Sequence, residues 1–347
     1  MQNHTIEEKL HLDQVDFDAL RKTHRGVIGI ISMGDMGSGI ARLLTAHNYA
    51  VVTNVSDRSE DTQSRARSTG AILLPSDQLL VQHSDVILSI VPPASALSTA
   101  QRITSSLVGD TPLSSEGKTL YYADLNAVSP STVKSISSLF DSHPNVKFID
   151  GSILGGPPSL SLDDDDDTPK AWTKPLIPTS GPFSFSSVYD SPELSAILRA
   201  KHISDKIGQA SGLKMVFASL SKGYAAVALQ SITTAQQLGV LPELVESVTE
   251  LQGGAAGRKL ERAVTGLAPK AGRWEREMKE IGRTHRENGG WGREEGIFEA
   301  AAEIYRAVAT ETVLGREKIG RREKGTTVEG VAVAVAEGLE KRKARGE

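Results

Sequence analysis

The segment that follows Val27 has residue types and a spacing suited to binding a phosphate. An apolar run ends at Ile31 and leads into a turn with Gly34 and Gly37, after which a helix with apolar periodicity begins. In such a strand, turn and helix, one glycine lets the backbone approach a pyrophosphate, and the next lets the helix pack closely on the strand. The free amide groups of the first helical turn then face the negative charge. Ser32 stands where the pattern usually has its first glycine.

We predict that this turn binds a dinucleotide, because it ends the first strand of an alternating pattern and another short strand follows its helix. An ordinary strand–helix turn is the alternative. The residues expected to lie along the cofactor are Ser32, Met33, Gly34, Asp35, Met36 and Gly37.

The end of the second apolar run carries groups that would select the cofactor. Asp57 follows Gly37 at about the 20-residue spacing at which a carboxylate accepts the ribose hydroxyls of NAD. Arg58, flanked by Ser56 and Ser59, would instead bind the 2′-phosphate of NADP, since a guanidinium and two hydroxyls make a phosphate pocket. Both residues would otherwise be solvated turn residues. We favour NADP and keep NAD as the alternative.

The elements that must position this turn alternate between strand and helix, which predicts a doubly wound α/β domain with a parallel sheet. The expected strands are Val27–Ile31, Ala50–Thr53, Val86–Val91, Leu120–Ala123 and Val146–Ile149. The expected helices are Met36–Ala46, Ser59–Ser68, Ala94–Leu107 and Ser129–Ser142. Two short extended stretches, Leu176–Thr179 and Lys201–Ile203, are expected to add strands at the sheet edge.

The second half of the chain is predicted to be helical. A long helix begins near Ser211 and ends at Leu238, and it is expected to bridge two domains. We divide the chain into a tail at 1–24, a Rossmann-type domain at 25–208, and a helical domain at 209–347. Residues 157–182, with the aspartates Asp163–Asp167, are expected to form a flexible acidic loop. Further helices are expected at Pro242–Leu251, Trp274–Arg286, Ile297–Val313 and Val328–Lys343, the last with a capping box at Thr326 and Glu329.

Composition excludes several classes of protein. The 347 residues are 39% hydrophobic and carry a net charge of −4, which fits a folded chain without an electrostatic attraction to nucleic acid or an anionic membrane. The absence of cysteine excludes disulfides, thiolate metal sites and cysteine nucleophiles, and no other residue spacing suggests a metal. The N-terminal residues lack the features of a signal peptide, and no apolar run approaches the roughly 20 residues that span a bilayer. We therefore expect a cytoplasmic protein.

Several stretches in order resemble the β-hydroxyacid dehydrogenase and 6-phosphogluconate dehydrogenase superfamily, which includes 3-hydroxyisobutyrate dehydrogenase. Besides the glycine turn in Ile28–Leu44, they are Ser84–Pro93, Asp124–Pro130, Asp150–Gly156 and Gly208–Gly223. Pro269–Ile281 and Ala300–Ala309 resemble a branch with its own helical C-terminal domain of the 6-phosphogluconate dehydrogenase type. The resemblance covers roughly residues 25–340.

The resemblance implies that Lys214 is the catalytic general acid and base. Lys214, Ala218 and Lys222 fall on one helical stripe, beside an apolar stripe with Phe217 and Leu220, and small residues around two lysines would form the floor of a pocket. Lys222 is either an anion contact for the substrate or a surface lysine. The superfamily commonly has Asn, His and Glu on this helix where the chain has Phe217, Ala218 and Ser221, which implies a more apolar pocket and argues against 6-phosphogluconate as substrate.

Other site residues are implied by the same motifs. Val91, Pro92 and Pro93 stand in the cofactor loop, and Asn126 is expected to contact the substrate or the nicotinamide ribose. Substrate contacts are expected at Ser129, Ser152, Gly155 and Gly156. Ser129 would otherwise be a helix cap, and the two glycines a plain turn.

The sequence therefore predicts an NAD(P)-dependent oxidoreductase that transfers hydride between nicotinamide and a small hydroxyacid, ketoacid or related carbonyl compound. Imine reduction and a non-catalytic dinucleotide sensor are the alternatives. The expected partners are a small-molecule substrate and a second copy of the chain, bound through the helical domain, with the active site between the domains.

Overall fold

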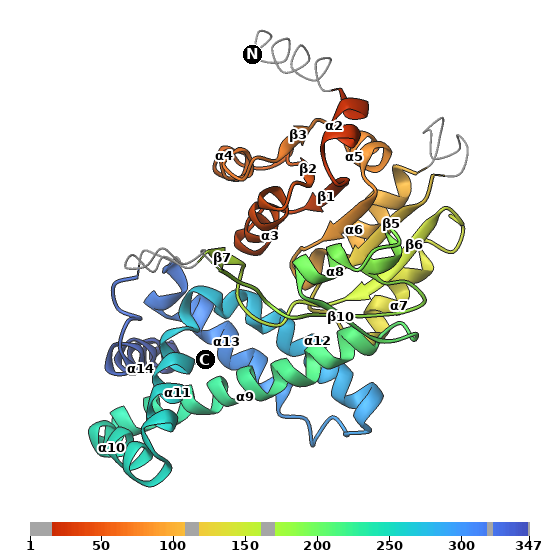
Figure 1. The fold of residues 1–347 in the computed structure, drawn as a ribbon. Helices are drawn as coiled ribbons and strands as arrows, with labels where there is room; N and C mark the ends of the chain where they lie inside the picture. The colour runs from red at the N-terminus through yellow and green to blue at the C-terminus, as the bar shows by residue number, and fades with distance from the viewer. Residues whose placement is uncertain (1–15, 108–117, 161–170, 318–321, 346–347) are drawn as a thin grey trace. The chain divides into compact units, whose positions relative to one another are not determined.

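The computed structural model describes residues 16–107, 118–160, 171–317 and 322–345 (Figure 1). Two compact units make up the chain, Met1–Lys214 and Met215–Glu347. The boundary between them lies six residues beyond the one expected at 208 and falls inside a single helix, α9 (Gln209–Leu238).

The N-terminal unit is built on an eight-stranded sheet with the order β10-β9-β6-β5-β4-β1-β2-β3. Strands β1 to β6 run parallel to one another, β9 pairs antiparallel to β6, and β10 pairs parallel to β9. Their bounds are β1 Val27–Ile31, β2 Ala50–Asn54, β3 Ile72–Leu74, β4 Val86–Ser89, β5 Leu120–Asp124, β6 Val146–Gly151, β9 Ile177–Ser180 and β10 Ala200–Ser204. The topology confirms the predicted Rossmann-type fold, with both predicted edge strands at the sheet edge.

The strand order reverses direction at β1, which lies between β2 and β4. In open α/β sheets, ligands bind in the crevice outside the carboxyl ends of the strands on either side of such a switch point. Helix α3 (Asp35–Ala46) follows β1 and helix α6 (Pro93–Ser105) follows β4, so their N-terminal ends flank this crevice.

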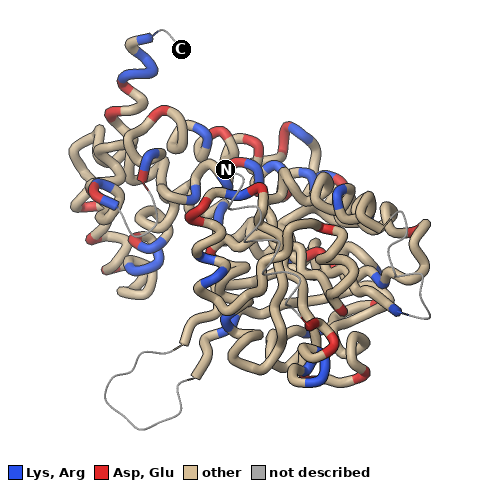
Figure 2. Tube along the Cα trace, turned by 90° about the horizontal axis from the view of Figure 1, so that it is seen from above, with Lys and Arg blue, Asp and Glu red and all other residues tan. Residues whose placement is uncertain are grey.

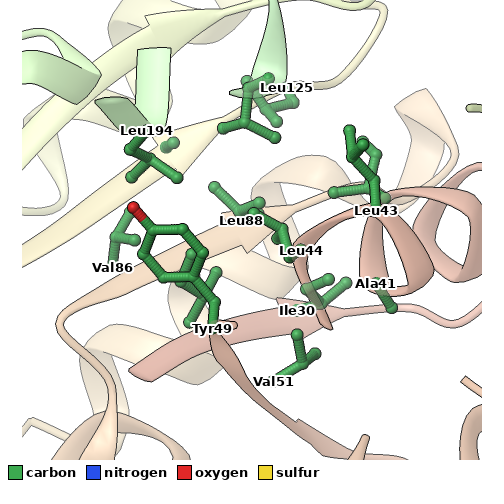
Figure 3. Packing of buried hydrophobic residues seen from close by; sticks show 14 of the residues in the cluster. Ile30, Ala41, Leu43, Leu44, Tyr49, Val51, Val86, Leu88, Leu125 and Leu194 are labelled. Carbon is green, nitrogen blue, oxygen red and sulfur yellow. The ribbon is translucent and has the colours of Figure 1, made fainter. Parts of the chain in front are cut away.

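Two aliphatic clusters cover the two faces of the sheet, because side chains alternate between faces along each strand. Ile28 and Ile30 of β1 contribute to the cluster that includes α3, whereas Val27 and Ile31 contribute to the other. Figure 3 shows part of the first cluster, which includes Leu43 and Leu44 of α3, Val51 of β2 and Leu88 of β4. The remaining helices of this unit are α2 Phe17–Thr23, α4 Glu60–Arg67, α5 Asp77–His83, α7 Pro130–Ser138 and α8 Glu193–Leu198.

Some expectations for this unit were wrong. Strand β3 and helix α5 were not predicted, since β3 has only three residues and carries little periodicity. Part of the expected N-terminal tail forms α2, in which Phe17 and Leu20 pack against the buried core. The expected loop 157–182 contains the paired strands β7 (Ser159–Leu160) and β8 (Trp172–Thr173), which were not predicted, in addition to the predicted β9. The aspartates Asp163–Asp167 lie outside the described residues.

The C-terminal unit is helical, as predicted. After α9 it contains α10 Leu241–Gln252, α11 Gly254–Thr265, α12 Ala271–Gly289, α13 Phe298–Glu311 and α14 Val328–Ala344. Helix α12 packs against α13, with a ring contact between His285 and Phe298 at 4.4 Å. Helix α11 was not predicted, because its glycines are typical of a break. The cap of α14 is Thr327, whose side chain accepts a hydrogen bond from the Gly330 amide, and not the expected Thr326.

Lys and Arg positions are interspersed with Asp and Glu positions along the described parts of the chain (Figure 2). Within the described ranges, no helix combines the length and apolar character needed to cross a bilayer.

Candidate functional site

The glycine turn adopts the backbone that its sequence pattern requires. Ser32 has φ +78°, a left-handed conformation that is strained for any residue except glycine, which explains why this position is usually a glycine. A Cβ on Gly37 would lie 2.1 Å from the carbonyl oxygen of Ser32, so only glycine lets α3 pack this closely on the turn. A Cβ on Gly34 would meet nothing closer than the Ser32 hydroxyl at 4.0 Å. The space above Gly34 therefore fits an approaching pyrophosphate.

The start of α3 offers positive potential at the same place. Gly34 is the N-cap and provides no side-chain hydrogen bond, so the first amide groups of the helix have no side-chain cap. Asp35 is exposed, and Met36 packs partly against the aliphatic core. The Arg65 guanidinium on α4 donates a hydrogen bond to the Met33 carbonyl oxygen at 3.2 Å. Arg65 was not among the predicted residues, because nothing in the sequence pattern places α4 beside the turn.

The loop after β2 presents exposed charged groups. Ser56 is fixed through its amide and hydroxyl, which both donate to the side-chain oxygen of Asn54 at 3.1 and 2.8 Å. Ser59 is the N-cap position of α4. Asp57 and Arg58 form an ion pair at 3.3 Å, and about half of each side chain is exposed. These residues are accessible to a ligand.

A second guanidinium, that of Arg102 on α6, reaches the same loop. Its Nη1 lies 3.8 Å from an oxygen of Asp57, and its Nε lies 2.7 Å from an oxygen of Asp77. The negative charge of Asp57 is therefore balanced by arginines from two elements, Arg58 and Arg102. Arg102 was not among the predicted residues, because only the pairing of β2 and β4 with β1 brings α6 beside the loop.

Asn126 joins two loops at the carboxyl edge of the sheet. Its side-chain oxygen accepts from the Val91 amide at 2.7 Å, and its side-chain nitrogen donates to Ser89 at 3.1 Å and to Asp124 at 2.8 Å. The predicted prolines follow Val91, with Pro92 as the N-cap of α6 and Pro93 as its first residue. Asn126 thereby holds the predicted cofactor loop in place.

Asp124 and Asp150 lie side by side at the ends of β5 and β6, where they are register partners. Both are fully buried. Burial raises the pKa of Asp124 to about 7, against the hydrogen bonds from the Asn126 amide and side chain, and the nearby charge of Asp150 raises it further. Burial also raises the pKa of Asp150, although hydrogen bonds to Ser211, Ser180 and Gly208 oppose the shift.

Asp150 binds the beginning of α9. One of its carboxylate oxygens accepts from the Gly208 amide and the Ser180 hydroxyl, both at 2.7 Å, and the other accepts from the Ser211 hydroxyl at 2.6 Å. A carboxylate at a helix start satisfies unpaired amides and complements the helix dipole. Ser152 adds a bond from its hydroxyl to the Ala210 carbonyl oxygen at 2.9 Å. The start of α9 is therefore fixed to the end of β6.

Lys214 follows on this anchored turn. Its Nζ donates a hydrogen bond to the Ile153 carbonyl oxygen at 2.6 Å, which places the amine beside the segment that follows β6. In the same segment Gly155 has φ +127°, and a Cβ on Gly156 would meet nothing within 4 Å. Ser129 caps α7 by accepting from the Thr132 amide. The structure thus gathers Lys214 and the two glycines near the carboxyl edge of the sheet.

The substrate contacts expected from the side chains of Asn126, Ser129 and Ser152 stay predictions. In the structure all three side chains are buried and take part in internal hydrogen bonds. Cofactor contacts by the turn and by the loop after β2 likewise stay predictions. In the described part of the chain, His, Cys, Asp and Glu form no group of three or more that could hold a metal.

The surroundings of Lys222 differ from those of the residues described above. It belongs to the C-terminal unit, is 8% exposed, and forms an ion pair with the buried Glu277. Ala218 on the predicted stripe is buried, and so is Ala225, which follows Lys222 on the same helix. The predicted apolar stripe is the exposed one, with Phe217 at 51% and Leu220 at 77%. Lys222 is therefore not the surface lysine that was its alternative, and the pocket floor and substrate contact expected of this stripe stay predictions.

Comparison with known proteins agrees with this architecture. Residues 27–113 match a family described as NADP oxidoreductase, coenzyme F420-dependent, and residues 235–308 match a domain of unknown function, DUF1932. An uncharacterized 28.5 kDa protein in the 7S RNA 5′ region of Methanothermus fervidus is 28% identical over 230 residues, which are 65% of this chain and 77% of that protein.

Solved structures with low sequence identity share the fold. The 3-hydroxyisobutyrate dehydrogenase of Salmonella typhimurium is 15% identical with a TM-score of 0.58, over 89% of this chain and 99% of that one. Psf3, solved with NADP+ and 2-OPP, is 17% identical with a TM-score of 0.56, over 88% and 99%. Residues 27–113 and 235–308 are thus similar to an NADP oxidoreductase family and to DUF1932, and the chain shares the fold of the 3-hydroxyisobutyrate dehydrogenases, as the sequence resemblance implied.

The raised pKa of Asp124 predicts a pH-dependent stability. An aspartate in an unfolded chain has a pKa of about 3.9, so the folded state binds the proton more tightly. The stabilisation from the protonated carboxyl is complete below about pH 4 and is lost as the pH rises through about 7. Carbon-13 NMR of the aspartate carboxyl groups should show one resonance that titrates near pH 7 and disappears in Asp124→Asn.

The control is Asp141→Asn, which changes an exposed aspartate of the same unit and should leave that resonance in place. A carboxyl resonance of Asp124 that titrates below pH 5 would contradict the assignment.

Proposed function

We propose that the protein is an NADP-dependent oxidoreductase that transfers hydride between the nicotinamide ring and a small hydroxyacid, ketoacid or related carbonyl compound. The observation that supports it most directly is the glycine turn: Ser32 holds a backbone conformation typical of glycine, and Gly34 leaves open space above the uncapped start of α3. A strand, turn and helix of this shape at a switch point are suited to a dinucleotide. The NADP+ bound by Psf3, which shares the fold, is consistent with this cofactor.

The residues of the N-terminal unit fit such a cofactor. The amides at the start of α3 would bind the pyrophosphate, Arg58 would bind the 2′-phosphate, and the Val91–Pro93 loop would lie along the dinucleotide. When bound, the cofactor supplies or accepts the hydride. Arg102 would keep the charge of Asp57 balanced, which lowers the repulsion between Asp57 and a 2′-phosphate.

Lys214 would move the proton that accompanies hydride transfer. Its ammonium donates to the substrate oxygen when a carbonyl is reduced, and its neutral amine accepts the proton when an alcohol is oxidised. Asp150 positions it by holding the start of α9, and the Ile153 carbonyl oxygen orients Nζ through a hydrogen bond of 2.6 Å.

Imine reduction is the second candidate, because the positions after Lys214 that commonly carry polar groups in the superfamily hold Phe217 and Ala218. An imine is less polar than a hydroxyacid and suits such a helix. A non-catalytic dinucleotide sensor is the third candidate, and turnover separates it from the other two.

We expect Lys214→Met to bind NADPH with unchanged affinity and to lose most of its turnover, by about 100-fold or more, because general acid–base groups contribute roughly 10²–10⁴ in rate. Cofactor binding is measured by nicotinamide fluorescence, and turnover is measured with panels of hydroxyacids, ketoacids and cyclic imines. Turnover that survives in the variant would remove Lys214 from proton transfer, and NADPH binding without any turnover would favour the sensor.

Arg58→Ala should weaken NADPH at least about tenfold, roughly 1.4 kcal/mol, and leave NADH nearly unchanged, because only NADPH has the 2′-phosphate. Arg67→Ala removes the same charge from an exposed position on α4 and serves as the control. Equal weakening of both cofactors by Arg58→Ala would contradict the phosphate contact and favour NAD.

We also propose that the protein forms a homodimer through its helical unit. Helix α9 carries an exposed apolar stripe with Val216 at 45%, Phe217 at 51%, Leu220 at 77% and Val227 at 59% exposure. These positions recur at helical spacing, so they form one face that a second copy would cover. The cytoplasmic location expected from the sequence stays a prediction.

Leu220→Glu should therefore convert a dimer to a monomer in light scattering coupled to size-exclusion chromatography, because a carboxylate would be buried at the interface. Leu251→Glu, at a leucine of 81% exposure on α10, is the matched control and should leave the mass unchanged. A wild-type protein that is monomeric at micromolar concentration would contradict the proposal.

A further inference from the structure

A cluster of cations surrounds Trp274 in the C-terminal unit. The ammonium nitrogens of Lys222 and Lys270 lie 5.7 and 5.9 Å from the centre of its ring. Arg273, the preceding residue on α12, places its Nε 3.1 Å from a carboxylate oxygen of Glu277. Three positive charges therefore meet one negative charge, because Glu277 serves both Lys222 and Arg273.

The inner part of the cluster is a fixed and balanced pair. Lys222 and Glu277 are 8% and 5% exposed and form an ion pair with each other. The Tyr305 hydroxyl donates to the Lys222 carbonyl oxygen at 2.6 Å, and the Tyr305 ring meets Trp274 edge-on at 5.3 Å. Glu277 pairs with Lys222 through Oε2 and with Arg273 through Oε1, so one carboxylate is shared between two cations and the excess positive charge lies on the outer side, at Lys270 and Arg273.

The outer cations are accessible to a small ligand. The side chain of Arg273 is 55% exposed, and Lys270 is half-buried. Among the residues that the structure describes, no carboxylate lies within ion-pair distance of Lys270. An anion arriving from solvent would therefore find two positively charged groups beside an aromatic ring, with no internal carboxylate occupying Lys270.

Without a bound anion, the positive charges of this cluster repel one another. Burial and the positive charges of Arg273, Arg322 and Lys222 lower the pKa of Lys270. Lys270 is also the N-cap of α12, and Arg273 stands in its first turn, where the helix dipole repels cations and the first turn holds no acidic residue. Arg322 adds to the field, although Glu317 lies near it and balances its charge in part. Like charges held together in this way are stabilised by a bound anion.

We propose that Lys270 and Arg273, supported by Lys222, Glu277 and Trp274, form a binding site for the carboxylate of a small organic acid. A guanidinium matches the planar fork of a carboxylate, and an ammonium beside it adds a point charge. The choice of a carboxylate as the anion rests on the proposed function, since hydroxyacids and ketoacids carry this group. The site lies within the segment that matches DUF1932, apart from Lys222 on α9.

The test measures binding of malonate to the full-length protein by calorimetric titration, with sodium chloride at the same ionic strength as the reference. The double variant Lys270→Gln/Arg273→Gln should weaken malonate about tenfold or more, because both direct contacts are lost. The matched control, Arg276→Gln/Lys279→Gln, removes the same charges from exposed positions of the same helix and should leave the affinity unchanged. Lys270→Arg keeps the charge and should retain binding.

Several results would overturn the proposal. The site would be disproved if malonate bound no better than chloride. It would also be disproved if the Lys270/Arg273 double variant, shown to be folded by circular dichroism, bound malonate as the wild type does. Tighter binding of inorganic phosphate than of malonate would overturn the carboxylate assignment. The titration uses no nicotinamide cofactor, so it tests the anion site separately from the proposed function. Malonate binding by a protein that does not bind NADPH would support this site and contradict the proposed function. NADPH binding and turnover without malonate binding would contradict this site and leave the dehydrogenase proposal standing.

Discussion

The hydrogen bonds of the Asp150 carboxylate are the interaction on which the candidate site most depends. Asp150 lies near the end of β6 and accepts hydrogen bonds from Gly208, Ser180 and Ser211. These bonds attach the start of a 30-residue helix, which carries Lys214, to a rigid sheet edge. A buried carboxylate is tolerated only when its oxygens are satisfied in this way, so the loss of one donor would expose the whole arrangement to a desolvation cost.

The other half of the site depends on close backbone contact rather than on charge. At Gly37 the helix approaches the carbonyl of Ser32 so closely that no side chain fits, and Asn126 uses its whole amide to join the loops after β4 and β5. The Gly37 contact and the Asn126 hydrogen bonds both fix the conformation of the backbone, and neither places a side chain in the crevice. These contacts place no side chain where a ligand would approach, and the groups that can meet a ligand are main-chain amides and the exposed charges after β2.

Much of the N-terminal unit was predictable because a buried parallel strand is a continuous apolar run, and the chain alternates such runs with helix-length segments. The glycine turn was predictable since its conformations admit few residue types. Strand β3 and helix α11 escaped prediction, the first because it is very short and the second because its glycines are typical of a break. Which face of α9 is buried was not predicted, because periodicity identifies a stripe but not the neighbour that buries it.

The sequence by itself determined the fold class and the turn, because these depend on local residue types and their spacing, and its resemblance to a known superfamily singled out Lys214. Only the tertiary structure revealed Arg65 and Arg102 beside the turn and the following loop, and Lys270 and Arg273 beside the buried Lys222–Glu277 pair. Such groups come from elements far apart in the chain and meet through strand order or helix packing. A side chain's charge is visible in the sequence, but the charges that surround it are decided when the elements pack together.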